Sequence, residues 1–121
     1  MKSEENTGKY VRNILRTPEF MEFYGSLPAK VQTKFQYVKN VIATVYNIST
    51  KFVKHLENTD LYEMRVSIGT NEYRTVLFAI DHDNVIECKN IILLNGFLKK
   101  DSKDYRKQIE IAIRILNNLE L

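Results

Sequence analysis

Two runs of alternating apolar and polar residues, joined by a turn, most constrain what this chain can fold into. They lie at 61–68 and 73–80, within the stretch LYEMRVSIGTNEYRTVLFAI. A period of two residues places successive side chains on opposite faces of a strand. Gly69 can take the positive φ that a tight turn requires. A third apolar run, 85–94, follows a second turn, DHDN. We therefore expect a three-strand antiparallel meander.

The segments around the meander predict three helices and one more strand. Thr17-Pro18-Glu19 is a helix start, with a capping residue, a first-turn proline and an acid in the favoured order. Asn95-Gly96 is expected to end the third meander strand, and 52–56 is either a connecting turn or a short strand. The remaining predictions are a strand at 9–16, helices at 18–25 and from about 28 to 46, and a last helix at 103–120 capped by Asp101-Ser102.

This order of elements indicates an α+β domain with helices on one face of its sheet. The predicted sheet is small, twisted and mostly antiparallel, with two N-terminal helices and a C-terminal helix. The length of 121 residues fits a single domain over 1–121, in which the polar residues 1–8 are expected to be flexible.

Composition excludes several classes of protein. No apolar run approaches the ~20 residues of a membrane span, and the start of the chain, MKSEENTGKY, does not look like a secretory leader. The lone Cys88 suits a small packed side chain in a reducing compartment, so we expect a cytoplasmic protein. The short motifs of zinc, nucleotide-binding and serine-nucleophile enzymes are absent from the sequence. The turn DHDN is better explained as solvated than as a metal site.

Two arginines inside the predicted hairpin are the strongest chemical signal. Arg65 and Arg74 lie on adjacent strands, close to opposite each other across the turn. Guanidinium groups bind phosphate oxygens through paired hydrogen bonds, and residues 87–107 are locally basic, with six cations against three anions. Glu63 lies two residues before Arg65, so a simple Glu–Arg pair within the sheet is an equally good interpretation.

At these residues the sequence resembles a known family. LYEMRV, then EYRTVLFAIDHDNVIECKNIILLNGFLKK, then an amphipathic helix is similar to the HigB-like branch of the RelE/ParE toxin superfamily. The similarity covers about residues 52–121, and the helix SLPAKVQTKFQYVKNVI fits the family more loosely. The resemblance implies the toxin of a type II toxin–antitoxin system that cuts messenger RNA on the ribosome and thereby inhibits translation.

The resemblance also implies the site. Its motif positions assign the catalytic endoribonuclease surface to Arg65 and Arg74 and to the pair Lys99 and Lys100, with Glu63 orienting Arg65. More weakly aligned candidates are Lys54 and His55 before the hairpin, and Lys103, Arg106 and Lys107 are candidate RNA-binding residues.

In the expected mechanism, cations stabilise the phosphate charge that grows as a ribose 2′-hydroxyl attacks. A lysine or His55 would act as the base. Neither a metal nor a cofactor is expected. The general acid is unassigned, because Tyr105 is the one nearby aromatic candidate and does not match the family position clearly.

Other interpretations remain open at the level of the sequence. ParE-type relatives on the same fold bind DNA gyrase without cutting RNA, and an inactive binding domain is a further alternative. The expected partners are a cognate helix-turn-helix antitoxin, messenger RNA and the ribosome, and no membrane. The wide apolar face of the last helix, with Ile111 and Ile115, is either core or a surface for a partner or for a second copy in a homodimer.

Overall fold

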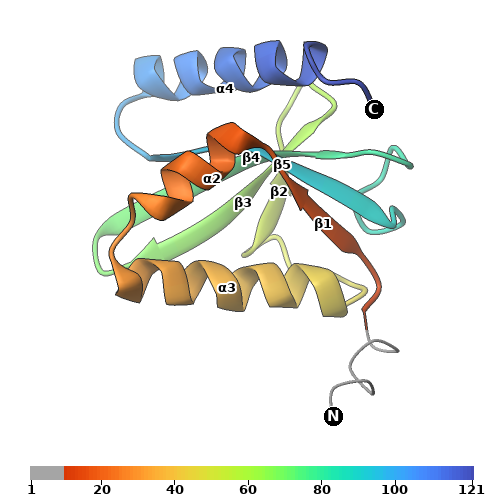
Figure 1. Cartoon of the computed structure of the whole chain (residues 1–121), viewed down its shortest axis with the longest axis horizontal. Coiled ribbons are helices and arrows are strands. Elements are labelled where there is room, and N and C mark those ends of the chain that lie inside the picture. Colours follow the sequence, from red (N-terminus) through yellow and green to blue (C-terminus); the bar gives the residue numbers. More distant parts are fainter. Residues whose placement is uncertain (1–9) are drawn as a thin grey trace.

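The computed structural model describes residues 10–121 (Figure 1). The predicted flexible segment 1–8 and the first residue of the predicted first strand lie outside this part of the chain. The described elements are three helices and a five-strand mixed sheet with strand order β1-β5-β4-β3-β2. In chain order they are β1 (Asn13–Arg16), α2 (Pro18–Gly25), α3 (Ala29–Thr44), β2 (Val53–His55), β3 (Leu61–Ile68), β4 (Asn71–Ala79), β5 (Asn90–Leu98) and α4 (Ser102–Asn117).

The helices cover both faces of the sheet, so the expectation of helices on one face was wrong. Helices α2 and α3 lie on one face and α4 lies on the other (Figure 1). The physical reason is visible in β5, where Ile91 and Leu93 pack towards α3 while Ile92 and Leu94 pack towards α4. A strand that is apolar on both sides requires a cover on each.

The predicted meander is confirmed. Strands β3 and β4 pair antiparallel with Arg65 directly opposite Arg74, and β4 pairs antiparallel with β5. Gly69 has a φ of +59°, as its place in the turn requires. The open choice at 52–56 resolves as the short strand β2, and the first strand is shorter than predicted and pairs parallel to β5.

The third meander strand begins and ends later than predicted. It starts at Asn90 rather than Val85, because the segment before it forms a turn held by side chains and carbonyls of 81–84. The carboxylate of Asp81 accepts hydrogen bonds from the backbone N–H groups of Lys89 and Asn90, and Asn84 accepts from Ile86. The DHDN motif thus works as a backbone cap in this turn.

The strand also continues past Asn95-Gly96, because a β-bulge at Leu94 accommodates one extra residue without ending the pairing with β4. Val76 pairs with Asn95 and Leu77 with Leu93, which leaves Leu94 as an extra residue. The consecutive residues Leu94 and Asn95 therefore both face α4, where the Asn95 side chain donates to the carbonyl of Gln108. After the bulge, Phe97 lies on the same face as Arg74, its direct partner on β4.

The helix starts agree with the predicted capping. The Thr17 hydroxyl accepts from the Phe20 N–H, and the Asp101 carboxylate accepts from the Asp104 N–H. The ends of α3 and α4 fall a few residues inside the predicted ranges. On α4, Ile115 packs into the core against the sheet and Ile113 is exposed, so part of the wide apolar face is core.

Buried Arg12 ties together segments that are distant in the chain. Its guanidinium donates five hydrogen bonds to backbone carbonyls at the end of α3 (Ile42, Val45 and Tyr46) and in the turn before β5 (Val85 and Ile86). These acceptors satisfy every donor of the side chain. The cation also lies at the C-terminal end of a helix, where the macrodipole favours positive charge.

We predict that Gly96→Ala destabilises the fold by about 1–3 kcal/mol through overpacking. A Cβ at this position would lie 2.3 Å from the ring of Phe23 on α2, so the ring or the strand would have to move. Gly25→Ala is the matched control, because a Cβ there meets nothing within 4 Å. Urea unfolding measures both variants, and equal losses would contradict the close approach of α2 to β5.

Candidate functional site

The candidate site is centred on the buried carboxylate of Glu63 on β3. Its side chain is only 4% exposed. One carboxylate oxygen accepts a hydrogen bond from Arg65 Nε at 2.7 Å, and the other accepts from the hydroxyl of Tyr105 on α4. Arg74 Nε lies 3.6 Å from the oxygen that Arg65 binds, within ion-pair distance. We call Glu63, Arg65, Arg74 and Tyr105 the Glu63 cluster.

The two arginines of the cluster share one face of the sheet but differ in exposure. The Arg74 side chain is 6% exposed, and Arg65 is 30% exposed. Arg74 Nη1 binds the carboxylate of Glu72 at 3.2 Å and the carbonyl of Tyr73. In this conformation Arg74 holds the cluster together and is out of reach of a large ligand, whereas Arg65 is accessible.

Tyr105 links α4 to the arginines, and sequence reasoning left its role open. It packs edge-on against Phe97, with ring centroids 5.9 Å apart. Burial, followed by the hydrogen bond to Glu63 and the charge of that carboxylate, raises the pKa of Tyr105 well above its usual range. The phenol therefore stays protonated and donates to Glu63 at neutral pH. Its place one turn before the core residue Ile109 is the signal that put it on the inner face of α4.

Lysines flank the cluster on the same side. Lys54 on β2 is paired directly with Glu63, so both side chains project from the same face, and Lys54 is exposed. The Lys99 ammonium lies 5.9 Å from the centre of the Tyr105 ring, a cation–π arrangement. Lys100 follows it and is also exposed. Two of the predicted lysines thus border the Glu63 cluster.

The other predicted residues lie elsewhere. His55 pairs with Tyr62, which places it on the opposite face of the sheet from Glu63, and its Nε2 lies 2.8 Å from the Thr59 carbonyl. Lys103, Arg106 and Lys107 are exposed and alternate with Asp104 and Glu110 on the solvent side of α4. The structure therefore does not bring these four residues to the cluster.

Glu72 and Ser67 extend the cluster at the end of the hairpin and were not predicted. The Ser67 hydroxyl donates to the Glu72 carboxylate at 2.7 Å, and this carboxylate also accepts from Arg74. The Ser67 hydrogen bond and then Arg74 lower the pKa of Glu72. Their cross-strand pairing in the confirmed register was the available signal.

No group of three or more His, Cys, Asp or Glu side chains within residues 10–121 is arranged to hold a metal ion. Cys88 is buried, and its thiol donates to the Val85 carbonyl. Burial raises the pKa of this thiol, which makes it a poor nucleophile. The helices of the described chain are each too short or too polar to cross a membrane.

Comparison with known proteins places the chain in a family. Residues 22–117 match the family model described as phage derived protein Gp49-like (DUF891), which covers well over half of the sequence. The chain belongs to the Gp49-like family. No curated protein matches it.

The fold of this Gp49-like protein is that of a RelE toxin. It is similar to the structure, in the free state, of an Escherichia coli RelE toxin mutant in which two arginines are replaced by alanine. The TM-score is 0.58 and the sequence identity is 14%. The alignment covers 83% of this chain and 96% of RelE. The structural similarity agrees with the predicted RelE/ParE-like fold, and neither the family match nor the fold distinguishes the HigB branch.

We predict that, as the pH rises above about 10, the stability of Tyr105→Phe decreases less than that of the parent protein. The pKa of Tyr105 is raised in the folded state, so its contribution to stability is complete below the unfolded pKa of about 10 and decreases as pH rises above it. Urea unfolding between about pH 8 and 11 should show a shallower decline for Tyr105→Phe than for the parent protein. The exposed Tyr37→Phe is the control; an identical decline in all three proteins would contradict the buried phenol–carboxylate contact.

Proposed function

We propose that this Gp49-like protein is the toxin of a type II toxin–antitoxin module and that it cleaves messenger RNA on the ribosome. The observation that best supports this proposal is the contact between Arg65 and Glu63. Its Nε donates to buried Glu63, while its two terminal nitrogens have no hydrogen-bond partner within residues 10–121. A guanidinium fixed through Nε presents its outer edge for a paired contact with phosphate oxygens.

Preorganisation is the physical advantage of this arrangement. Glu63 is itself immobilised by Tyr105 and by the nearby Arg74, so Arg65 does not have to be ordered when a phosphodiester arrives. Charge develops on the phosphate as the ribose 2′-hydroxyl attacks, and a fixed cation stabilises that charge without reorganisation. Arg74 acts through Glu63 and is a positioning residue in this proposal.

The flanking lysines provide the remaining chemistry. Lys54 on β2 is paired with Glu63, and Lys99, which follows β5, lies over the ring of Tyr105. In the proposed reaction one of them, in its neutral form, accepts the proton of the 2′-hydroxyl as this oxygen bonds to phosphorus. The bond between phosphorus and the 5′ oxygen breaks, and the 5′ oxygen takes a proton from water. The other lysine, with Lys100, attracts the RNA backbone. His55 faces the other side of the sheet and takes no part.

The proposed partners follow from the same assignment. A helix-turn-helix antitoxin encoded beside the toxin would hold it inactive, and the ribosome would present the messenger RNA. The exposed Ile113 on α4 offers an apolar contact to a protein partner. A homodimer through this helix stays a prediction.

We predict that Arg65→Ala lowers messenger RNA cleavage about a hundredfold or more, the usual cost of removing one preorganised donor of this kind. Induction in a bacterial host, followed by primer extension on messenger RNA, measures the cuts together with growth arrest. Arg65→Lys keeps the charge but lacks the paired donors, and it should retain only part of the activity.

Lys30→Ala is the matched control, because Lys30 is an exposed cation at the start of α3, on the other face of the sheet. Circular dichroism confirms that each variant is folded. Undiminished cuts in folded Arg65→Ala would refute the proposed role of Arg65. DNA damage without messenger RNA cuts would instead favour a gyrase-directed toxin.

A further inference from the structure

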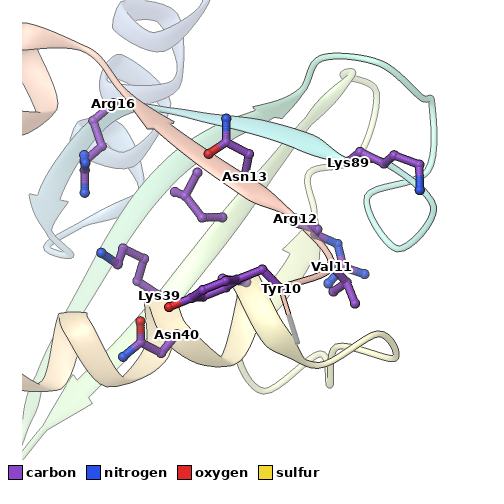
Figure 2. Close-up of a pocket in the computed structure, with 10 residues that line it drawn as sticks. Tyr10, Val11, Arg12, Asn13, Arg16, Lys39, Asn40 and Lys89 are labelled. Carbon is purple, nitrogen blue, oxygen red and sulfur yellow. The ribbon is translucent and has the colours of Figure 1, made fainter. Parts of the chain in front are cut away.

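A second basic surface lies on the opposite side of the sheet from the Glu63 cluster. It is a groove of about 460 Å³ between the edge strand β1 and helix α3 (Figure 2). The residues that line it include three cations, two asparagines and an exposed tyrosine; we call it the β1–α3 groove. These residues are Arg16, Lys39, Lys89, Asn13, Asn40 and Tyr10.

The cations in this groove are not neutralised by the residues that line it. None of the lining residues within the described chain is acidic. Burial lowers the pKa of Lys39, and repulsion from Arg16 lowers it further, with no carboxylate acting in the opposite direction. The nearby Asp81 carboxylate accepts hydrogen bonds from backbone N–H groups of the turn. Two like charges held close together without an acid are typical of a site that binds an anion.

The separation of the cations indicates an extended ligand. Figure 2 shows Arg16 and Lys39 pointing into one end of the groove, with Lys89 at the other end. In the register of β1 and β5, Arg16 is aligned with Leu93, four residues beyond Lys89. This offset of four residues corresponds to about 13 Å along the strand. A single phosphate ion would not span both ends, whereas a chain of phosphates would.

The other lining groups favour a polynucleotide over an acidic polypeptide. Tyr10 is 54% exposed at the rim of the groove, where an aromatic ring can stack on a base. The exposed Asn40 supplies both a donor and an acceptor, as base edges and ribose hydroxyls require. A carboxylate-rich peptide would need only the cations. Arg12 also lines the groove, but its donors are already occupied by backbone carbonyls.

We propose that the β1–α3 groove binds the sugar–phosphate backbone of a single-stranded nucleic acid, as a second contact surface separate from the Glu63 cluster. That the strand is RNA rests on the proposed function; that the groove binds a polynucleotide does not. The proposed cleavage would then involve two surfaces on opposite faces of the sheet, one that holds the scissile phosphodiester and one that holds a more distant stretch of RNA.

Binding of a short 2′-O-methyl oligoribonucleotide, which cannot be cleaved through its 2′ position, tests the proposal by fluorescence anisotropy over a range of salt concentrations. The groove variant is Arg16→Gln/Lys39→Gln. The control, Lys30→Gln/Arg114→Gln, removes one exposed lysine from α3 and one exposed arginine from α4, so both variants lose the same charge. Both are also made with Arg65→Ala, which separates this site from the Glu63 cluster.

We expect the groove variant to bind several-fold more weakly than the control. The slope of log affinity against log salt should fall by about 1.4, or roughly 0.7 for each lost phosphate contact. The difference should persist with Arg65→Ala, whether or not the protein cleaves RNA. Equal binding by the groove variant and the control would overturn the proposal.

Two further ligands, DNA and an acidic polypeptide, test which kind of polyanion the groove binds. An oligodeoxynucleotide that binds more tightly than the 2′-O-methyl oligoribonucleotide, with the same dependence on Arg16 and Lys39, would support the groove as a nucleic-acid site and overturn its assignment to RNA. Polyglutamate that binds as tightly as the oligonucleotide, with the same dependence, would overturn the proposal in favour of an acidic protein partner.

Discussion

The burial of one carboxylate, Glu63, governs how the candidate site is built. An ionised carboxylate at this depth costs several kcal/mol unless charges and hydrogen bonds offset its desolvation. Here Arg65 and Tyr105 donate to it and Arg74 lies at ion-pair distance. Because Tyr105 belongs to α4, the requirement also fixes where the last helix lies on the sheet. Folding and site assembly are therefore one event: the contacts that stabilise Glu63 also orient Arg65.

The β-bulge at Leu94 determines which side chains meet this carboxylate. Without the extra residue, Phe97 would project towards α2, and the ring that Tyr105 packs against would be absent from the α4 face. With it, Gly96 faces α2 and allows Phe23 to approach the strand closely. The single bulge thus sets which side chains face α4 and which face α2. This is the usual role of a bulge near a functional surface, which redirects side chains without ending the strand.

Local patterns were sufficient to predict much of this structure from the sequence. The alternation in β3 and β4, the caps at Thr17 and Asp101 and the pairing of Arg65 with Arg74 all depend on residues close in the chain. The bulge was missed because Asn95-Gly96 has the composition of a strand end, and only packing against α2 and α4 keeps the strand intact. The helix on each face, the Arg12 contacts with residues more than 70 positions away, and the groove all depend on long-range packing. The role of Tyr105 was ambiguous, because the helical period predicts that it faces the sheet but not that its hydroxyl bonds to Glu63.

The contrast between Arg65 and Arg74 shows why residue type and spacing alone do not define such a site. Both are permanent cations on one face and are directly paired. Arg74 is enclosed by Glu63, Glu72 and the Tyr73 carbonyl, so its charge is used within the fold. Arg65 lies near the edge of the sheet, where its backbone N–H donates to the carbonyl of Phe52, and its side chain stays 30% exposed. The place of each strand in the sheet is consistent with the two roles: β4 is central, between β3 and β5, whereas β3 is next to the edge strand β2.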